Sequence, residues 1–374
     1  MSKKQIVCRV TASPQSEGLE FQWSEGARSS GPYHLTGLVL QSFDQAVAES
    51  REALLNIAEH SRDQHLELLP ADCLTLARAG FDLYQSLFPP RVGEGIDPDM
   101  IREWLENLRD SEEIASVEVL LAGSNTGRSV PWNVVYDQPP NPDWFQATAE
   151  PDKQSRVWRP FWGVRYNLAI GRNSNLMQQM PWKNQEPHVV FIVDPSVLPE
   201  NEWAELQAFA NRHGYPILQS RDALDNYRSP TPVDLLYWLC HADPSALILG
   251  GWRIDPVNLF RVCQRLFRRQ PRGLVVLNAC QTAVEGGEGS YIEALHAAGL
   301  SGMVATEGWT LNIFANRFGI ALLQAFLIDG VPIGEALQNL RAGGSVSEPL
   351  GLLYGAYCPP YIRVVRPPAD APGE

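Results

Sequence analysis

Residues 273–280 run Gly-Leu-Val-Val-Leu-Asn-Ala-Cys, an almost unbroken apolar stretch that ends in a thiol. A short apolar run of this kind is typical of a strand buried on both faces of a parallel sheet. We therefore predict a buried strand here, with Cys280 at its carboxyl end. The stretch decides the fold class, because a strand buried on both faces needs helices above and below it.

A second stretch of the same kind, residues 234–241, runs Asp-Leu-Leu-Tyr-Trp-Leu-Cys-His and ends in an imidazole. In open α/β sheets, ligands bind in the crevice beyond the carboxyl ends of the strands. A thiol and an imidazole that meet there form the minimal dyad of a cysteine hydrolase, which predicts Cys280 as nucleophile and His241 as its base. Successive strand residues point to opposite faces, so Cys240 is predicted to pack in the core.

Strand and helix patterns alternate regularly from residue 188 onward. Further strands are predicted at 188–193, 216–219 and 302–306, and helices at 202–213, 256–269, 290–298, 312–328 and 333–341. This alternation predicts an α/β fold: a mostly parallel sheet with helices on both faces. A mixed α+β N-terminal region precedes it.

The chain is predicted to divide into three regions. They are a β and helical region at 1–110 with a regulatory or partner-docking role, a region at 111–366 that carries the dyad and has its catalytic core at 186–366, and a flexible tail at 367–374. Within the first region, a helix is predicted from Ser42 to His60 with Ser42 as its N-cap. Another is predicted from Pro98 to Arg109, with the proline in its first turn.

Composition excludes several functional classes. The net charge of −13 disfavours direct binding of nucleic acid. No apolar stretch is long enough to span a membrane and the chain begins without a signal-peptide core, which predicts a cytoplasmic protein. The six cysteines form no CxxC pair and no HExxH occurs, so neither a metal nor another cofactor is expected. One basic cluster has the spacing of a solvated helix face rather than a phosphate-binding stripe: Arg261, Arg265, Arg268, Arg269 and Arg272.

The residue after a strand-end nucleophile usually begins a turn, which exposes backbone N–H groups. We expect the N–H groups of Cys280 and Ala242 to hold the oxyanion that forms during acyl transfer. The glycines at 286, 287 and 289 lie where a dinucleotide fingerprint would, but Ile292 replaces its third small residue. They are better explained as a flexible loop beside the nucleophile.

Four segments of this chain resemble the CHAT-domain cysteine peptidases of the caspase-like superfamily. They are Val130 to Asp137 (VPWNVVYD), Leu239 to Ala242 (LCHA), Leu277 to Ala283 (LNACQTA), and Gly289 through Trp309. The likeness covers roughly residues 65–365, and the segments around His241 and Cys280 are its specific part. The family usually has Gly where this chain has Ala242, and Glu where it has Asn133.

The resemblance implies a caspase-like sheet, the dyad His241 and Cys280, and endopeptidase activity on a protein substrate. Relatives often belong to defence or programmed-death systems and are held inactive until a protein partner switches them on. Such a switch would order residues 281–289 and 307–312 here. The alternative is a pseudopeptidase that keeps the fold and serves as a protein-binding module. Retention of both dyad residues favours the enzyme, and Ala242 favours the alternative.

Both predicted catalytic segments lie in acidic sequence. No Lys or Arg occurs between residues 273 and 316 or between 229 and 252. Carboxylates that line the crevice would favour a basic residue before the scissile bond. Asp243 and Glu307 are the candidates for this pocket, with Trp309 as a further substrate contact; carboxylates on solvated loops are the alternative.

Overall fold

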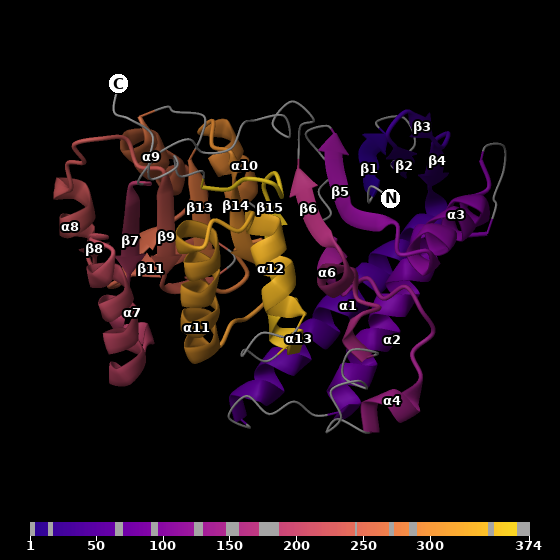
Figure 1. Ribbon diagram of the computed structural model, residues 1–374, viewed down its shortest axis with the longest axis horizontal. Coiled ribbons are helices and arrows are strands. Elements are labelled where there is room, and N and C mark those ends of the chain that lie inside the picture. Colours follow the sequence, from indigo (N-terminus) through magenta and orange to yellow (C-terminus); the bar gives the residue numbers. More distant parts are fainter. Residues whose placement is uncertain are drawn as a thin grey trace, which may run out of the picture. The chain divides into compact units, whose positions relative to one another are not determined.

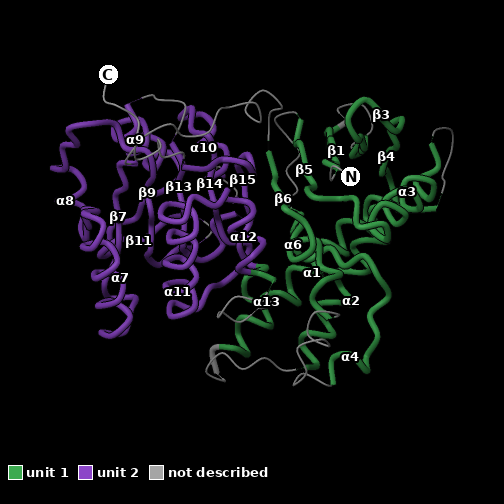
Figure 2. Tube along the Cα trace, viewed as in Figure 1, with its two compact units in different colours: residues 1–177, 341–352 green, residues 178–340, 353–374 purple. Residues whose placement is uncertain are grey.

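The computed structural model describes two compact units, each with its own sheet. The described residues are 4–13, 18–63, 70–90, 96–122, 130–146, 157–171, 187–243, 245–268, 273–283, 290–342 and 348–364. Unit 1 comprises residues 1–177 and 341–352, and unit 2 comprises 178–340 and 353–374 (Figure 2). The predicted tail at 367–374 lies outside the described residues.

Unit 1 is built on a mixed sheet with the strand order β3-β2-β1-β5-β6, and β4 pairs with β2. The strands are β1 (Lys4–Ser13), β2 (Gly18–Glu25), β3 (Arg28–Ser29), β4 (Tyr33–Leu35), β5 (Ile114–Ala122) and β6 (Asn167–Gly171). β1 runs parallel to β5, whereas β2 is antiparallel to its neighbours. The division therefore differs from the boundary predicted at 110/111, because β1 and β5 pair in one sheet across that point.

The helices of unit 1 confirm most of the predicted elements. They are α1 (Gly37–Asp63), α2 (Pro70–Leu87), α3 (Pro98–Asp110), α4 (Pro142–Gln146), α6 (Trp162–Arg165) and α13 (Glu348–Gly351), with a 3-10 turn at Trp132–Val134. α3 begins at Pro98 as predicted, and the side chain of Asp97 caps it. The prediction of Ser42 as an N-cap was wrong: Ser42 lies inside α1, where its hydroxyl donates to Leu38 O at 3.1 Å.

Unit 2 is built on the sheet β15-β14-β13-β9-β7-β8. The strands are β7 (Val189–Val193), β8 (Ile217–Leu218), β9 (Leu235–Leu239), β13 (Leu274–Asn278), β14 (Gly302–Thr306) and β15 (Tyr354–Tyr357). All pairs are parallel except β14 with β15. Every residue of β7, β9 and β13 is buried, which confirms the predicted mostly parallel sheet.

Helices cover both faces of this sheet (Figure 1). They are α7 (Glu200–Arg212), α8 (Arg221–Asn226), α9 (Pro256–Phe267), α10 (Tyr291–Ala297), α11 (Asn312–Leu323) with a π-helical extension at Gln324–Ile328, and α12 (Ile333–Arg341). From β7 the sheet order runs outward to β8 in one direction and through β9, β13 and β14 in the other. Right-handed crossovers in opposite directions place α7 on one face and α9 and α10 on the other. α11 packs beside α7, and α10 beside α9.

The strand predicted through His241 was too long. β9 ends at Leu239, and His241 begins a separate antiparallel sheet of three short strands: β10 (His241–Asp243), β11 (Ala246–Leu249) and β12 (Trp252–Ile254). Gly250 and Gly251, both with positive φ, form the turn between β11 and β12. We call these three strands the β10–β12 hairpin. His241, the predicted base, is its first residue, so the position of the hairpin determines where the imidazole lies.

Three residues of the predicted basic cluster are described, Arg261, Arg265 and Arg268, and all are exposed, as expected for a solvated helix face; Arg269 and Arg272 lie outside the described residues. Arg265 donates to Leu224 O at 2.8 Å, and Arg268 donates to Ser229 O at 2.5 Å. These bonds hold the end of α8 and the loop after it, so two of the exposed arginines also have a structural role. Across the described part of the chain, no helix combines the length and the apolar character needed to cross a membrane.

Candidate active site

The register of the parallel sheet brings Cys280 and His241 to the same level. Asn278 of β13 pairs with Leu239 of β9, and each chain continues two residues further to reach Cys280 and His241. Neighbouring strands lie about 4.8 Å apart. Cys280 is half-buried and His241 is exposed. Both side chains are described and no hydrogen bond joins them; catalytic hydrogen bonds are often long in unliganded enzymes and shorten with substrate.

A strained turn follows Cys280, the predicted nucleophile. Gln281 adopts φ +54°, which side chains with a Cβ rarely do, and its N–H donates to Gly308 O at 2.9 Å. Two residues on, the N–H of Ala283 donates to Thr306 O at 2.9 Å. These two bonds fix the turn after Cys280 to the end of β14, and they account for how the unfavourable φ is maintained.

Two buried threonines tie the same turn together from inside. The hydroxyl of Thr306 donates to the carbonyl oxygen of Ala279, the residue before the nucleophile. Thr282 Oγ1 accepts from the N–H of Thr306 at 3.1 Å and lies 3.2 Å from Leu277 O. Both threonines are almost fully buried, so their hydrogen bonds are formed away from water. The backbone around Cys280 is thereby held by hydrogen bonds to Thr282 and Thr306.

Asn278 anchors the strand beneath the nucleophile. Its Nδ2 donates to Tyr237 OH at 2.8 Å and to Ala315 O at 2.6 Å, and its Oδ1 accepts from Tyr354 OH at 2.5 Å. The network joins β9, β13, β15 and α11. α11 can approach so closely because it carries Gly319, where a Cβ would lie 2.3 Å from Tyr237 OH.

The sulfur of Cys280 faces the loop after β14. The N–H of Thr310 donates to Sγ at 3.5 Å, and Sγ lies 3.8 Å from Thr310 O, to which the thiol can donate. Trp309, between the two residues that contact the nucleophile turn, is 52% exposed. Sequence reasoning missed Thr310, because nothing in the local pattern shows that its backbone meets a thiol 30 positions earlier.

Cys280 differs from the other cysteines in its environment. All six lie among the described residues, and the other five are buried. Burial raises the pKa of Cys240 to about 12, with the nearby Asp194 and Cys280 adding to the effect against a backbone hydrogen bond from Ile248. Burial likewise raises the pKa of Cys358 to about 12. The predicted core position of Cys240 is confirmed, and Cys280 is the one half-exposed thiol.

The two proposed oxyanion donors occupy different settings. No backbone carbonyl in the described ranges accepts from the N–H of Cys280. Ala242 lies in β10, an edge strand, where alternate N–H groups point away from the partner strand. The φ of Ala242 is not positive, so its Cβ causes no strain and the departure from Gly is compatible with this backbone.

The predicted specificity residues are engaged with protein groups. Asp243 lies 2.9 Å from Arg253 Nη1 and accepts from Ser245 Oγ at 2.6 Å. The Ser245 hydroxyl lowers the pKa of Asp243 most; burial opposes it, and Arg253 with the N–H groups of Ser245 and Ala246 outweighs the burial, so that the pKa falls to about 2. Glu307 is only 3% exposed and accepts a hydrogen bond from Tyr357 OH. Glu307 thus lies inside the loop that contacts Cys280, and Asp243 lies on the strand of His241.

Sequence reasoning also missed Asp194. It follows β7, the neighbour of β9, so the rule that selected Cys280 and His241 applies to it as well. Within the described ranges, no three His, Cys, Asp or Glu side chains gather so that they could hold a metal ion.

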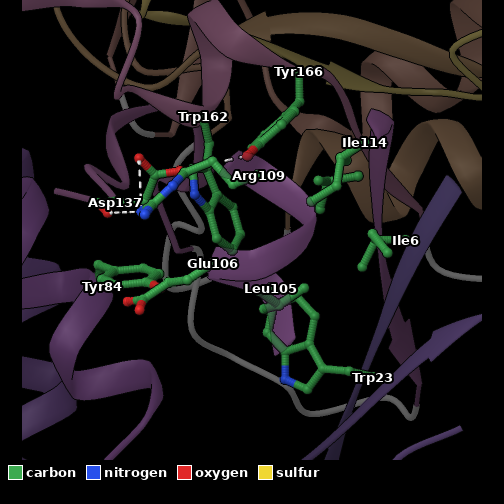
Figure 3. A pocket seen from close by; sticks show the side chains of 11 residues that line it. Ile6, Trp23, Tyr84, Leu105, Glu106, Arg109, Ile114, Asp137, Trp162 and Tyr166 are labelled. Carbon is green, nitrogen blue, oxygen red and sulfur yellow. Dashed lines mark hydrogen bonds and ion pairs between the residues drawn. The ribbon is translucent and has the colours of Figure 1, made fainter. Parts of the chain in front are cut away.

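A separate small pocket, partly open to solvent, lies in unit 1 (Figure 3). Its polar wall includes Asp137, which is 3.9 Å from Arg109 and 3.8 Å from Arg165. Burial raises the pKa of Asp137 to about 6, although the two arginines oppose the rise. Aromatic rings from Trp23 and Trp162 form the apolar side. None of the predicted catalytic residues lines this pocket.

No protein-family model matches the chain, and no curated protein matches it. It is similar to the crystal structure of the Saccharomyces cerevisiae separase–securin complex at 2.6 Å, with a TM-score of 0.50 and 10% identity over 96% of this chain and 30% of that chain. The structure of the same complex at 3.0 Å gives a TM-score of 0.48, 11% identity, and 95% and 30% coverage. This chain therefore spans about 30% of the length of the chains it matches. At this identity the likeness concerns the fold alone, and it agrees with the caspase-like α/β fold predicted from the sequence.

Proposed function

We propose that this chain is a cysteine endopeptidase in which Cys280 is the nucleophile and His241 its proton-transfer partner. The observation that carries the proposal is the register of β9 and β13. Cys280 and His241 each follow the carboxyl end of one of these paired strands by two residues. The half-exposed sulfur and its backbone donor from Thr310 support it. The CHAT-like segments further suggest a protein substrate and a place in a bacterial defence or cell-death type system.

The reaction follows from these groups. The sulfur of Cys280 attacks the carbonyl carbon of the scissile peptide while His241 takes or already holds the thiol proton. The N–H groups of Cys280 and Ala242 stabilise the resulting oxyanion. His241 then donates the proton to the leaving amine, which departs and leaves an acyl-enzyme. Water, deprotonated by His241, attacks the acyl carbon and restores the thiol.

For specificity, we propose a basic residue before the scissile bond. Glu307 in the nucleophile's supporting loop and Asp243 beside His241 supply negative charge, and the exposed Trp309 offers an apolar face to the substrate's alkyl stem. Arg253 already pairs with Asp243, so a substrate guanidinium there competes with an exposed ion pair, which is a weak competitor. Glu307 is almost fully buried, so Asp243 is the carboxylate of the two that a substrate side chain can reach.

We also propose activation by a protein partner that orders the loops around the nucleophile. Residues 284–289 of the predicted switch lie outside the described residues, whereas 307–312 lie within them. Moving a two-state equilibrium from mostly off to mostly on requires a partner to favour the active state by about 5 kcal/mol. An intact chain that is fully active alone would contradict this part of the proposal.

The test is cleavage of fluorogenic peptides that carry Arg, Lys, Asp or Leu before the reporter, by wild type, Cys280→Ala and His241→Ala. Cys240→Ala is the matched control, because it removes a neighbouring buried thiol. We expect cleavage after Arg and Lys, lost in both dyad variants and kept in the control. Cleavage after Asp or Leu would retain the peptidase and reject the basic pocket.

If no peptide is cleaved, residue-resolved alkylation decides between a gated enzyme and the alternative, a pseudopeptidase that serves as a binding module. A gated enzyme requires Cys280 to alkylate faster than the other five cysteines and to slow down in His241→Ala. Equal and slow labelling in both proteins would favour the binding module.

A further inference from the structure

Asp194 occupies the third strand end beside the dyad. It follows directly after β7, and its N–H donates to Leu239 O of β9 at 2.9 Å. In the sheet order, β7 and β13 flank β9 on its two sides. His241 follows β9, Cys280 follows the neighbouring strand β13, and Asp194 follows β7, the neighbour on the other side.

The carboxylate of Asp194 is built into the site. It is 6% exposed, and its Oδ1 accepts from Ser196 N at 3.0 Å and Ser196 Oγ at 2.6 Å. Its Oδ2 accepts from Gly250 N at 2.9 Å. A carboxylate has about four acceptor positions, and these bonds use three of them. One position on Oδ2 remains, on the oxygen that faces the hairpin.

The bond to Gly250 connects Asp194 to the element that carries His241. Gly250 begins the turn after β11, and β11 pairs with β10 so that Ile248 lies opposite His241. Asp194 therefore holds the hairpin against the end of the parallel sheet through one bond to the β11–β12 turn and one to the end of β9.

Asp194 differs from Asp243, the other carboxylate near His241, in having no arginine partner among the described residues. Further ionisable groups around the start of β10 include Cys240 and Cys280 at the strand ends, Asp243 and Arg253 on the hairpin, and Tyr291 of α10, which interacts with Cys240 and Asp243. Asp243 and Arg253 pair with each other at 2.9 Å, whereas no Lys or Arg in the described ranges pairs with Asp194. Burial opposes ionisation of Asp194, but the Ser196 and Gly250 hydrogen bonds and the field of His241 outweigh it and lower its pKa.

We propose that Asp194 is the positioning residue of the dyad: its carboxylate fixes the hairpin that carries His241 and stabilises the protonated imidazole that pairs with the Cys280 thiolate. The proposal rests on the proposed function. It assigns the proton-transfer unit a third member, contributed by the strand on the far side of β9, that touches neither the substrate nor the sulfur.

The experiment measures the alkylation rate of Cys280 by iodoacetamide against pH in the full chain, by residue-resolved mass spectrometry. This readout requires no activating partner. Asp194→Asn removes the charge and keeps the shape, and Asp225→Asn, an exposed carboxylate on α8, is the matched control. We expect Asp194→Asn to lower the rate near neutral pH about tenfold, the equivalent of one pH unit in proton affinity. The pH at which the His241-dependent rate is lost should move downward, while Asp225→Asn keeps the wild-type profile.

A double-mutant cycle separates positioning from general structural support. In His241→Gln, the further change Asp194→Asn should leave the rate unchanged, because Asp194 acts through the imidazole. If Asp194→Asn fails to fold, Asp194→Glu keeps the charge, and it should restore a rate within about threefold of wild type. An unshifted pH profile in a folded Asp194→Asn, or an equal loss in the His241→Gln background, would overturn the inference. If His241→Gln itself labels like wild type, the proposed dyad fails instead.

Discussion

Thr306 at the end of β14 and Thr310 in the loop after it both contact the segment around Cys280, and the structure predicts opposite effects when each is changed to Val. Thr306 Oγ1 donates to Ala279 O and lies 3.3 Å from Thr282 Oγ1. Thr310 Oγ1 is buried and has no hydrogen-bond partner within the described ranges. Valine has nearly the shape of threonine but lacks its hydroxyl. The two variants therefore compare the stability contributed by a hydrogen-bonded hydroxyl at residue 306 with that of an unsatisfied hydroxyl at residue 310.

The magnitudes follow from these contacts. Thr306→Val removes a hydrogen bond worth about 1 kcal/mol and leaves the buried carbonyl of Ala279 with only the longer contact from Thr282 Oγ1 at 3.3 Å, at a further cost of about 1 kcal/mol. We expect unit 2 to lose about 2 kcal/mol of unfolding free energy, a fall in melting temperature of about 4–8 °C for a domain of this size. Thr310→Val removes a desolvated hydroxyl and should raise the melting temperature by about 2–4 °C.

Thermal unfolding followed by far-UV circular dichroism measures both shifts, and alkylation of Cys280 supplies a second readout. Thr306→Val should slow alkylation because it loosens the backbone of Ala279, next to the nucleophile. Thr310→Val should not slow it, because the donor to Sγ is the backbone N–H, which valine keeps. Shifts of the same sign and size in the two variants would refute the view that the Thr306 hydroxyl supports the turn.

Two further predictions concern burial in the sheets. Burial raises the pKa of Glu118 to about 7 despite a hydrogen bond from Gln5, so stability falls as pH rises from about 4.5 to 7 and the full penalty, about 3 kcal/mol, is present above that range. Glu118→Gln should therefore stabilise the protein in urea unfolding at pH 8 and change it little at pH 4; equal effects at both pH values would contradict the assignment. Gly319→Ala should destabilise unit 2 by about 1–3 kcal/mol and slow Cys280 alkylation, because its Cβ would lie 2.3 Å from Tyr237 OH and 2.8 Å from Asn278 Nδ2; wild-type values in both measurements would show that the helix can move away freely.

The sequence was sufficient to predict the parallel sheet because its strands are continuous apolar runs. The fully buried β9 and β13 coincide with the runs at 234–241 and 273–280 except at their ends. The predicted strand through His241 was too long because Cys240 and Ala242 are as apolar as a strand interior. The doublet Gly250-Gly251 is a hairpin signal and could have revealed the separate sheet of β10, β11 and β12.

Other features depend on contacts that no local pattern contains. The parallel pairing of β1 with β5 joins segments about a hundred residues apart, and it moves the division of the chain well beyond residue 110. The bond from Thr306 to Ala279 and the donor from Thr310 to the sulfur likewise cross between segments. Asp194 could have been predicted from the sequence, because it follows the carboxyl end of a buried strand, as His241 and Cys280 do.

The supports of the nucleophile converge on one short loop, and this bears on how the proposed enzyme would be switched. Gly308 accepts the N–H of Gln281, and Thr310 donates to the sulfur of Cys280. A displacement of this loop alone would remove the acceptor that holds the strained turn and the donor to the sulfur together, while the strands beneath stay in place. Control by a partner therefore needs no rearrangement of the parallel sheet. The exposed Trp309, which lies between the two contact points, is where a partner or a substrate would act on both.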